Sequence, residues 1–142
     1  QILTKRSKRL KEFSKFYGVF PTNAWIGVSV ETSFYKGRIE DLKQVDARIH
    51  FLSLEPLLGP LGPLDLYDIE WVIVGGESGF GFRKCKPEWV REIRDQCINA
   101  GVPFFFKQWG GITSKANGRV FDGRTWNQFP NSVIKEVTQI SL

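Results

Sequence analysis

The sequence contains no methionine, one histidine and only two cysteines among its 142 residues. Cys85 and Cys97 form no Cys-x-x-Cys pair, so neither a disulfide framework nor a metal knuckle is indicated, and we expect two ordinary reduced thiols. Long hydrophobic runs are also missing: no stretch approaches the roughly 18 apolar residues that cross a bilayer, and no signal-peptide pattern opens the chain. These absences predict a cytoplasmic protein without a membrane segment.

The composition favours a folded domain: 42% of the residues are hydrophobic and 14% are aromatic. The chain carries 20 basic and 15 acidic residues, and this net charge of +5 permits contact with a polyanion without establishing it. The opening residues Gln-Ile-Leu-Thr-Lys are typical of the inside of a strand. Together with the lack of methionine, they predict a fragment of a longer protein.

The central stretch of the sequence is Trp71–Gly79, an apolar run that leads directly into the glycine pair Gly75 and Gly76. Such a run is typical of a strand buried on both faces in a parallel sheet. Glu77 then places a carboxylate at the strand end, where α/β folds bind ligands. The glycines would let backbone approach a ligand closely, although the segment matches neither the dinucleotide fingerprint nor the Walker motif.

The same strand-then-helix pattern repeats along the chain. Strands are predicted over residues 1–6, 25–31, 49–55, 71–76 and 102–108, with helices over 7–17, 32–44 and 86–100. Regular alternation predicts an α/β fold, specifically a parallel five-stranded partial (β/α) barrel over residues 1–111. Five units are too few for a closed barrel of eight, so we expect a fragment of a TIM-like barrel. Residues 112–142 are predicted to form a C-terminal excursion or tail packed on it, with a hairpin-type turn at Asp122-Gly123.

Polar side chains gather at the predicted strand ends. Alternation places Ser29 and Glu31 on the same face of the second strand, and the third strand repeats this with Ser53 and Glu55. His50 falls on the opposite face and is given no catalytic role. The predicted ligand-binding rim is Lys5, Ser29, Glu31, Ser53, Glu55, Gly75, Gly76, Glu77, Lys107, Gln108 and Trp109.

Converging carboxylates and cations can bind ammonium, hydroxyl and carboxylate groups or shift pKa values for acid–base work. We expect Glu31, Glu55 and Glu77 to point into one cavity, with Trp109 as the residue best suited to stack on a ligand. No metal ligands are predicted. The alternative for any single residue is an ion pair with a neighbour or with a helix terminus.

The densest basic run is Lys5–Lys11, at the start of the first predicted helix. Such a run is more often a solvated helix face than a nucleic-acid site. Contact with nucleic acid through this helix is therefore the alternative function, that of a non-catalytic binding module, and it is not the favoured one.

Six motifs occur in a fixed order: Ile-Leu-Thr-Lys-Arg, Trp-Ile-Gly-Val-Ser-Val-Glu, Phe-Leu-Ser-Leu-Glu-Pro-Leu-Leu-Gly, Trp-Val-Ile-Val-Gly-Gly-Glu-Ser-Gly, Phe-Phe-Phe-Lys-Gln-Trp-Gly-Gly and Asp-Gly-Arg-x-Trp. Over residues 1–130 the chain resembles the carboxyl-terminal half of the phage gp thirty-seven / gp sixty-eight family of phage and prophage proteins. Members resemble radical S-adenosylmethionine enzymes, with three closely spaced upstream cysteines suited to a four-iron cluster.

The resemblance implies S-adenosylmethionine and a four-iron cluster as cofactors of the full-length protein. The three cysteines are absent here, so we expect this chain to hold no cluster and to be inactive alone. The favoured function is the later-strand half of such an enzyme, contributing part of a rim that binds the cofactor or an unidentified small-molecule substrate. Its expected partner is the missing N-terminal half or a second copy of itself.

Overall fold

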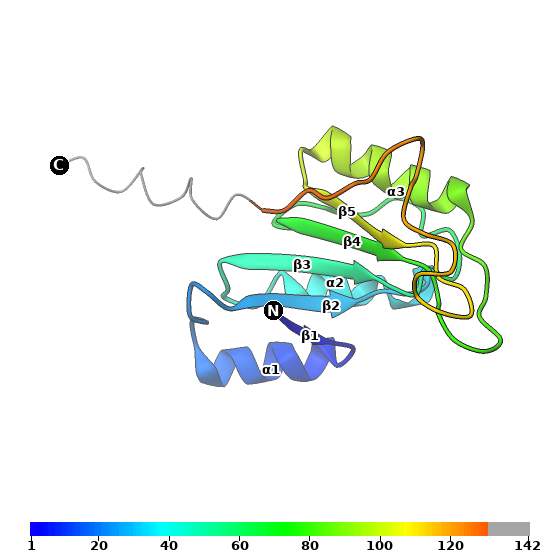
Figure 1. Cartoon of the computed structure of the whole chain (residues 1–142). Helices are drawn as coiled ribbons and strands as arrows, with labels where there is room; N and C mark the ends of the chain where they lie inside the picture. Colours follow the sequence, from blue (N-terminus) through cyan, green and yellow to red (C-terminus); the bar gives the residue numbers. More distant parts are fainter. Residues whose placement is uncertain (131–142) are drawn as a thin grey trace.

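The computed structural model describes residues 1–130, so the predictions made for residues 131–142 lie outside the described residues. It shows a five-stranded parallel sheet whose strands follow the chain in the order β1-β2-β3-β4-β5 (Figure 1). The strands are β1 (Ile2–Thr4), β2 (Trp25–Ser29), β3 (Ile49–Leu54), β4 (Trp71–Gly75) and β5 (Phe104–Gln108). The helices are α1 (Ser7–Tyr17), the 3₁₀ helix η1 (Ser33–Tyr35), α2 (Gly37–Leu42) and α3 (Pro87–Ala100).

The predicted α/β class and the parallel sheet are confirmed. The described strands form an open sheet, so the curvature of a partial barrel is not confirmed. The single helix expected over residues 32–44 is wrong, because it is divided into η1 and α2. Thr32 makes no side-chain cap at the start of this segment, and Gly37, a poor helix former, lies where the tighter turn becomes α-helical.

The helices all pack on one face of the sheet. Alternate strand residues such as Val28, Leu52 and Val74 are fully buried in one hydrophobic core. The apolar side of α3 joins this core through Ile93 and Cys97. Consecutive right-handed crossovers in an ordered parallel sheet bring their helices to the same side, so none of the helices within residues 1–130 covers the other face.

Helix α3 shows how the sequence sets its own bounds. Pro87 occupies the first turn, where its missing N–H leaves no hydrogen bond unmade. Gly101 adopts the left-handed conformation with φ 68° and caps the carboxyl end of the helix.

His50 is buried on the helix side of β3, where Nε2 lies 2.8 Å from the carbonyl oxygen of Val45.

The face without helices carries a layer of aromatic rings near the amino ends of the strands. Trp71 lies at its centre, with ring centroids of Trp25, Phe105 and Phe129 at 5.8, 5.8 and 5.1 Å. Phe51 lies over Gly27, where an added Cβ would come within 2.5 Å of the ring. The aromatic layer covers the half of this face near the amino ends of the strands, and the polar residues lie at the carboxyl ends.

The segment before residue 130 covers the β5 edge of the sheet. The amide of Phe106 donates to the carbonyl of Trp126 at 3.0 Å, and the amide of Gln128 donates to the carbonyl of Phe104 at 3.2 Å. Asp122-Gly123 forms the predicted turn, with φ values of 46° and 76°. The β1 edge, by contrast, has no partner strand within residues 1–130. None of the helices in that range is long and apolar enough to cross a membrane.

Candidate functional site at the carboxyl ends of the strands

Glu55 follows β3 and reaches across the neighbouring strand to the end of β5. Its two carboxylate oxygens lie 3.0 and 3.1 Å from Nζ of Lys107, and Nε2 of Gln108 donates to Oε1 at 3.1 Å. Gly75 of β4 lies beneath this side chain, and an added Cβ there would approach Cδ of Glu55 to 3.0 Å. A glycine in the middle strand therefore makes room for an ion pair that links the strands on either side.

A bulge in β5 explains why two successive residues reach the same carboxylate. Val74 is paired with Phe106, but the next residue, Gly75, is paired with Gln108, so Lys107 is skipped in the register. In a regular strand, neighbouring side chains point to opposite faces. The bulge redirects Lys107 and Gln108 so that both donate to Glu55.

Glu31 forms a second ion-pair group at the end of the neighbouring strand β2. Its carboxylate contacts Nζ of Lys5, and Nη1 of Arg38 lies 2.9 Å from Oε2. The same Arg38 nitrogen donates to the carbonyl of Ser29 at 2.7 Å. Burial raises the pKa of Glu31, but the hydrogen bond from Lys5 and the nearby positive charges outweigh it and hold the pKa below its usual value. Because only 8% of this side chain is exposed, Glu31 positions the two cations and offers little surface to a ligand.

Ser29 and Ser53 lie between these two groups. They are paired in the register of β2 and β3, and both are buried. Within residues 1–130 neither hydroxyl makes a side-chain hydrogen bond. The described site therefore combines one accessible carboxylate, one exposed ammonium and two hydroxyls whose hydrogen-bonding capacity is unused.

Glu77 belongs to a third and separate group. Its carboxylate takes two bonds from the Arg83 guanidinium, at 2.5 and 2.9 Å, and one from the Arg83 amide at 2.7 Å. These hydrogen bonds lower the pKa of Glu77 to about 2. The expectation that Glu77 shares a cavity with Glu31 and Glu55 is therefore not confirmed, because its carboxylate binds Arg83 of the same loop.

Gly76, the glycine after β4, lies against the backbone that follows β5. An added Cβ at Gly76 would lie 1.9 Å from the carbonyl oxygen of Trp109, and one at Gly110 would lie 2.0 Å from the carbonyl oxygen of Glu77. The two backbone segments interlock, with the Gly111 amide donating to the backbone carbonyl of Glu77 at 2.9 Å. Gly76 thus makes room for the backbone of Trp109, and its contact with a ligand stays a prediction.

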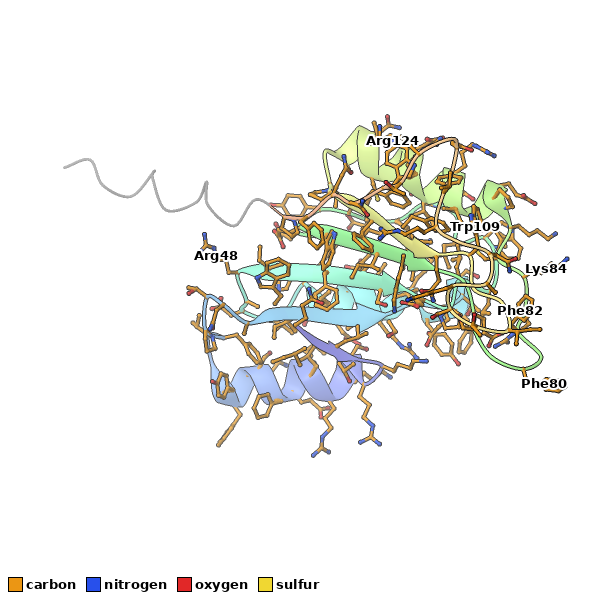
Figure 2. The ribbon with its side chains drawn as sticks, in the orientation of Figure 1. Arg48, Phe80, Phe82, Lys84, Trp109 and Arg124 are labelled. Carbon is orange, nitrogen blue, oxygen red and sulfur yellow. The ribbon has the colours of Figure 1, made fainter. Side chains whose placement is uncertain are left out.

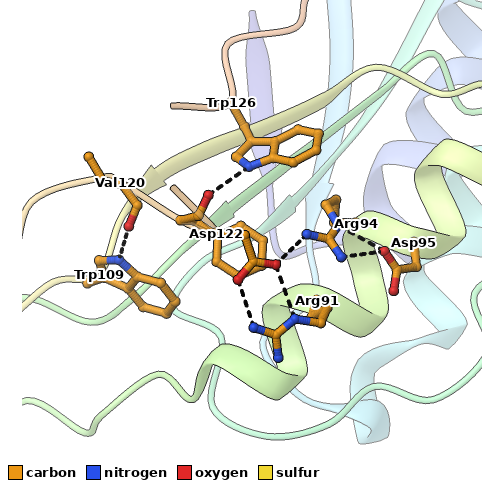
Figure 3. Close-up of polar contacts among 8 residues, drawn as sticks. Arg91, Arg94, Asp95, Trp109, Val120, Asp122 and Trp126 are labelled. Atoms are coloured by element: carbon orange, nitrogen blue, oxygen red, sulfur yellow. Dashed lines mark hydrogen bonds and ion pairs between the residues drawn. The ribbon is translucent and has the colours of Figure 1, made fainter. Parts of the chain in front are cut away.

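Trp109 follows β5 at the carboxyl end of the sheet (Figure 2), but its ring packs against the core on the helix side. Its ring packs on Phe106 and Phe121 at centroid distances of 4.6 and 5.7 Å. Its indole nitrogen donates to the carbonyl of Val120 at 2.8 Å (Figure 3). Phe106 belongs to the core beneath the helices. The structure therefore gives Trp109 a packing role, and its stacking on a ligand stays a prediction.

The loop that contacts Trp109 through Val120 is held against α3 by ion pairs. Asp122 lies 2.7 Å from Nη2 of Arg91 and 2.5 Å from Nη1 of Arg94 (Figure 3). The carboxylate pKa is lowered, chiefly by the hydrogen bond from Arg91. This contact holds the C-terminal excursion against the helix layer and leaves the opposite face of the sheet open.

Sequence reasoning missed two arginines, Arg38 and Arg83, which form ion pairs with Glu31 and Glu77 respectively. Arg83 had a local signal, because it follows Glu77 within one loop whose Gly79 and Gly81 both have positive φ and allow the chain to turn back. Arg38 had none: it comes from α2, and its contact with Glu31 depends on how that helix packs.

Comparison with known proteins identifies one family. The model of the family described as "Protein of unknown function (DUF5131)" matches residues 1–130. No curated protein and no solved structure matches the chain.

Proposed function

The chain belongs to the DUF5131 family, and we propose that the carboxyl-end rim of its sheet binds a small polar ligand with the chemistry of S-adenosylmethionine. The observation that supports this is the Glu55–Lys107–Gln108 group beside the unused hydroxyls of Ser29 and Ser53. All of these residues lie at the end of the sheet where parallel α/β folds bind ligands.

The charges of this rim complement an amino-acid group. The carboxylate of Glu55 accepts from the ligand ammonium, and Lys107, whose side chain is 51% exposed, donates to the ligand carboxylate. Each charge-assisted hydrogen bond contributes about 1.5–3 kcal/mol to binding. S-adenosylmethionine supplies an activated carbon bonded to its sulfonium wherever it is bound.

The arrangement of the sheet supports a wider proposal about the parent protein. Five strands in sequential order, with every helix on one face, are what consecutive (β/α) units of a TIM-like barrel produce. We take this chain as the later-strand half of such a barrel in a phage or prophage enzyme resembling the radical S-adenosylmethionine group. Its partner is an N-terminal half or a second copy of the chain, which covers the open face.

The two cysteines do not fit an iron–sulfur cluster. Burial raises the pKa of both thiols, Cys85 and Cys97, to about 12, and Cys97 points from α3 into the helix-side core. Within residues 1–130 no three metal-ligating side chains come together. Three thiolates for a cluster would have to come from outside this chain, and the proposed role of the chain itself is restricted to binding the ligand.

Isothermal titration of the full chain with S-adenosylmethionine tests the proposal. Glu55→Gln should weaken binding by about 10-fold or more, the loss of one charge-assisted bond. The melting temperature should hardly change, because surface ion pairs contribute about 0–1 kcal/mol. Glu40→Gln is the matched control, since Glu40 is exposed and lies on α2 away from the rim. Equal affinity in the Glu55→Gln variant and the control, or no heat of binding in the unmodified chain, would reject this ligand.

A further inference from the structure

A groove lies beside the rim, between the first turn of α1 and the segment that joins β2 to α2. We call it the basic groove; it has a volume of about 740 Å³, and its walls include Lys5, Arg6, Lys8, Arg9, Phe34 and Tyr35. The cations and the aromatic rings come from segments far apart in the sequence. From the sequence alone, the basic run offered nucleic-acid contact only as the less favoured alternative, and the aromatic pair opposite it was not singled out.

The basic groove has a surplus of positive charge. Arg6 and Arg9 are exposed, and neither makes an ion pair within residues 1–130. The one acidic residue among the lining residues, Asp41, already has its negative charge balanced by an ion pair with Lys11. Burial opposes the ionisation of Asp41, but hydrogen bonds from Lys11 and Ser7 lower its pKa. Exposed unpaired guanidinium groups of this kind are free to contact phosphate oxygens.

The groove also offers an aromatic ring to solvent. The side chain of Phe34 is 86% exposed, and Tyr35 packs edge-on against it at 5.1 Å. The guanidinium of Arg38 lies 4.0 Å from the centroid of the Tyr35 ring and holds that ring in place. Phe34 is therefore a supported ring with a free face, and such rings stack on nucleic-acid bases.

We propose that the basic groove binds single-stranded nucleic acid. The backbone phosphates lie along the first turn of α1, where Arg6 and Arg9 contact them, and a base stacks on Phe34. A strand fits better than a free nucleotide, because the cations continue along the helix surface beyond the reach of one phosphate. A single strand fits better than a duplex, because stacking on Phe34 needs an unpaired base.

Fluorescence anisotropy with a labelled oligothymidylate of about 12 nucleotides tests this in the full chain. Binding should weaken by roughly 20-fold between about 50 and 200 mM salt, as expected for three phosphate contacts. Phe34→Ala should weaken it at least about five-fold. Phe16→Ala is the matched control, because Phe16 is 92% exposed near the other end of α1.

The charged residues have their own comparison. Arg6→Ala with Arg9→Ala should lower the slope of log affinity against log salt by about 1.4, which is two phosphate contacts. Lys15→Ala, in the last turn of the same helix, should leave the slope unchanged. Equal affinity in Phe34→Ala and Phe16→Ala would overturn the proposal, as would tighter binding of duplex than of single strand. Competition by thymidine monophosphate at equal nucleotide concentration would assign the groove to a free nucleotide and overturn it too.

Discussion

The carbonyl oxygen of Trp109 occupies the space that a side chain on Gly76 would need: an added Cβ would lie 1.9 Å away. The contact joins the ends of β4 and β5 just beyond the bulge that directs Lys107 and Gln108 to Glu55. The glycine pair therefore serves the candidate site indirectly. Gly76 lets the two strand ends interlock, and Gly75 leaves room for the carboxylate.

The first prediction concerns this close approach. Gly76→Ala should lower the free energy of unfolding by about 1–3 kcal/mol, because backbone atoms must move to admit the methyl group. Urea denaturation followed by circular dichroism measures the change. Gly59→Ala is the control, since an added Cβ at Gly59 meets nothing within 4 Å and its φ is not positive. Equal stability of the two variants would show that the strand ends do not interlock as described.

The second prediction concerns Glu77. Its pKa is lowered from 4.5 to about 2 by the hydrogen bonds from Arg83, so the pair stabilises the fold above about pH 4.5. That stabilisation is lost as the pH falls through about 2, where the carboxylate is protonated in the folded state too. Arg83→Gln should return the pKa of Glu77 toward 4.5. Carbon-detected NMR titration of the Glu77 carboxyl group measures it.

Lys84→Gln provides the comparison for this titration, because Lys84 is the next residue and is exposed. It removes the same unit of charge from the same loop without touching the bonds to Glu77. A Glu77 pKa near 4.5 in the unmodified chain, or equal shifts in both variants, would contradict the bonded arrangement.

Local patterns in the sequence were enough to predict the order of elements. Helix α1 was predicted with the bounds that the structure shows, because its apolar residues repeat at helical spacing and Gly18 follows it. Strand β4 was predicted from its uninterrupted apolar run, and α3 from Pro87 and Gly101. Alternation also placed Glu55 on the open face correctly, which is why its contact with Lys107 lies where the rim was expected.

The partners of the polar side chains were harder to predict. The bulge at Lys107 depends on how β5 pairs with β4, and no residue within β5 marks it. Trp109 was assigned to the rim on strand-end position alone, but the excursion returns Phe121 beneath it and draws the ring to the helix side. Such contacts join segments far apart in the chain, and periodicity carries no information about them.

The open face of the sheet and its free edge present apolar surface together. Leu3 of β1 is 49% exposed on the open face, and Phe129 is 53% exposed at its far side. The β5 edge is covered by the chain itself, whereas within residues 1–130 no strand pairs with the outer edge of β1, whose backbone groups can accept another strand. This asymmetry identifies the β1 edge as the place where an added strand would extend the sheet.

The third prediction is that the isolated chain self-associates through the β1 edge and the open face. Leu3→Lys should shift the population toward monomer, because a charge on an edge strand blocks strand addition and removes apolar contact. Sedimentation velocity over a range of protein concentrations measures the distribution. Ile98→Lys is the matched control, since Ile98 is 55% exposed on α3, in the helix layer on the opposite side. A monomer at high concentration in the unmodified chain would reject self-association, and equal association of the two lysine variants would move the contact away from β1.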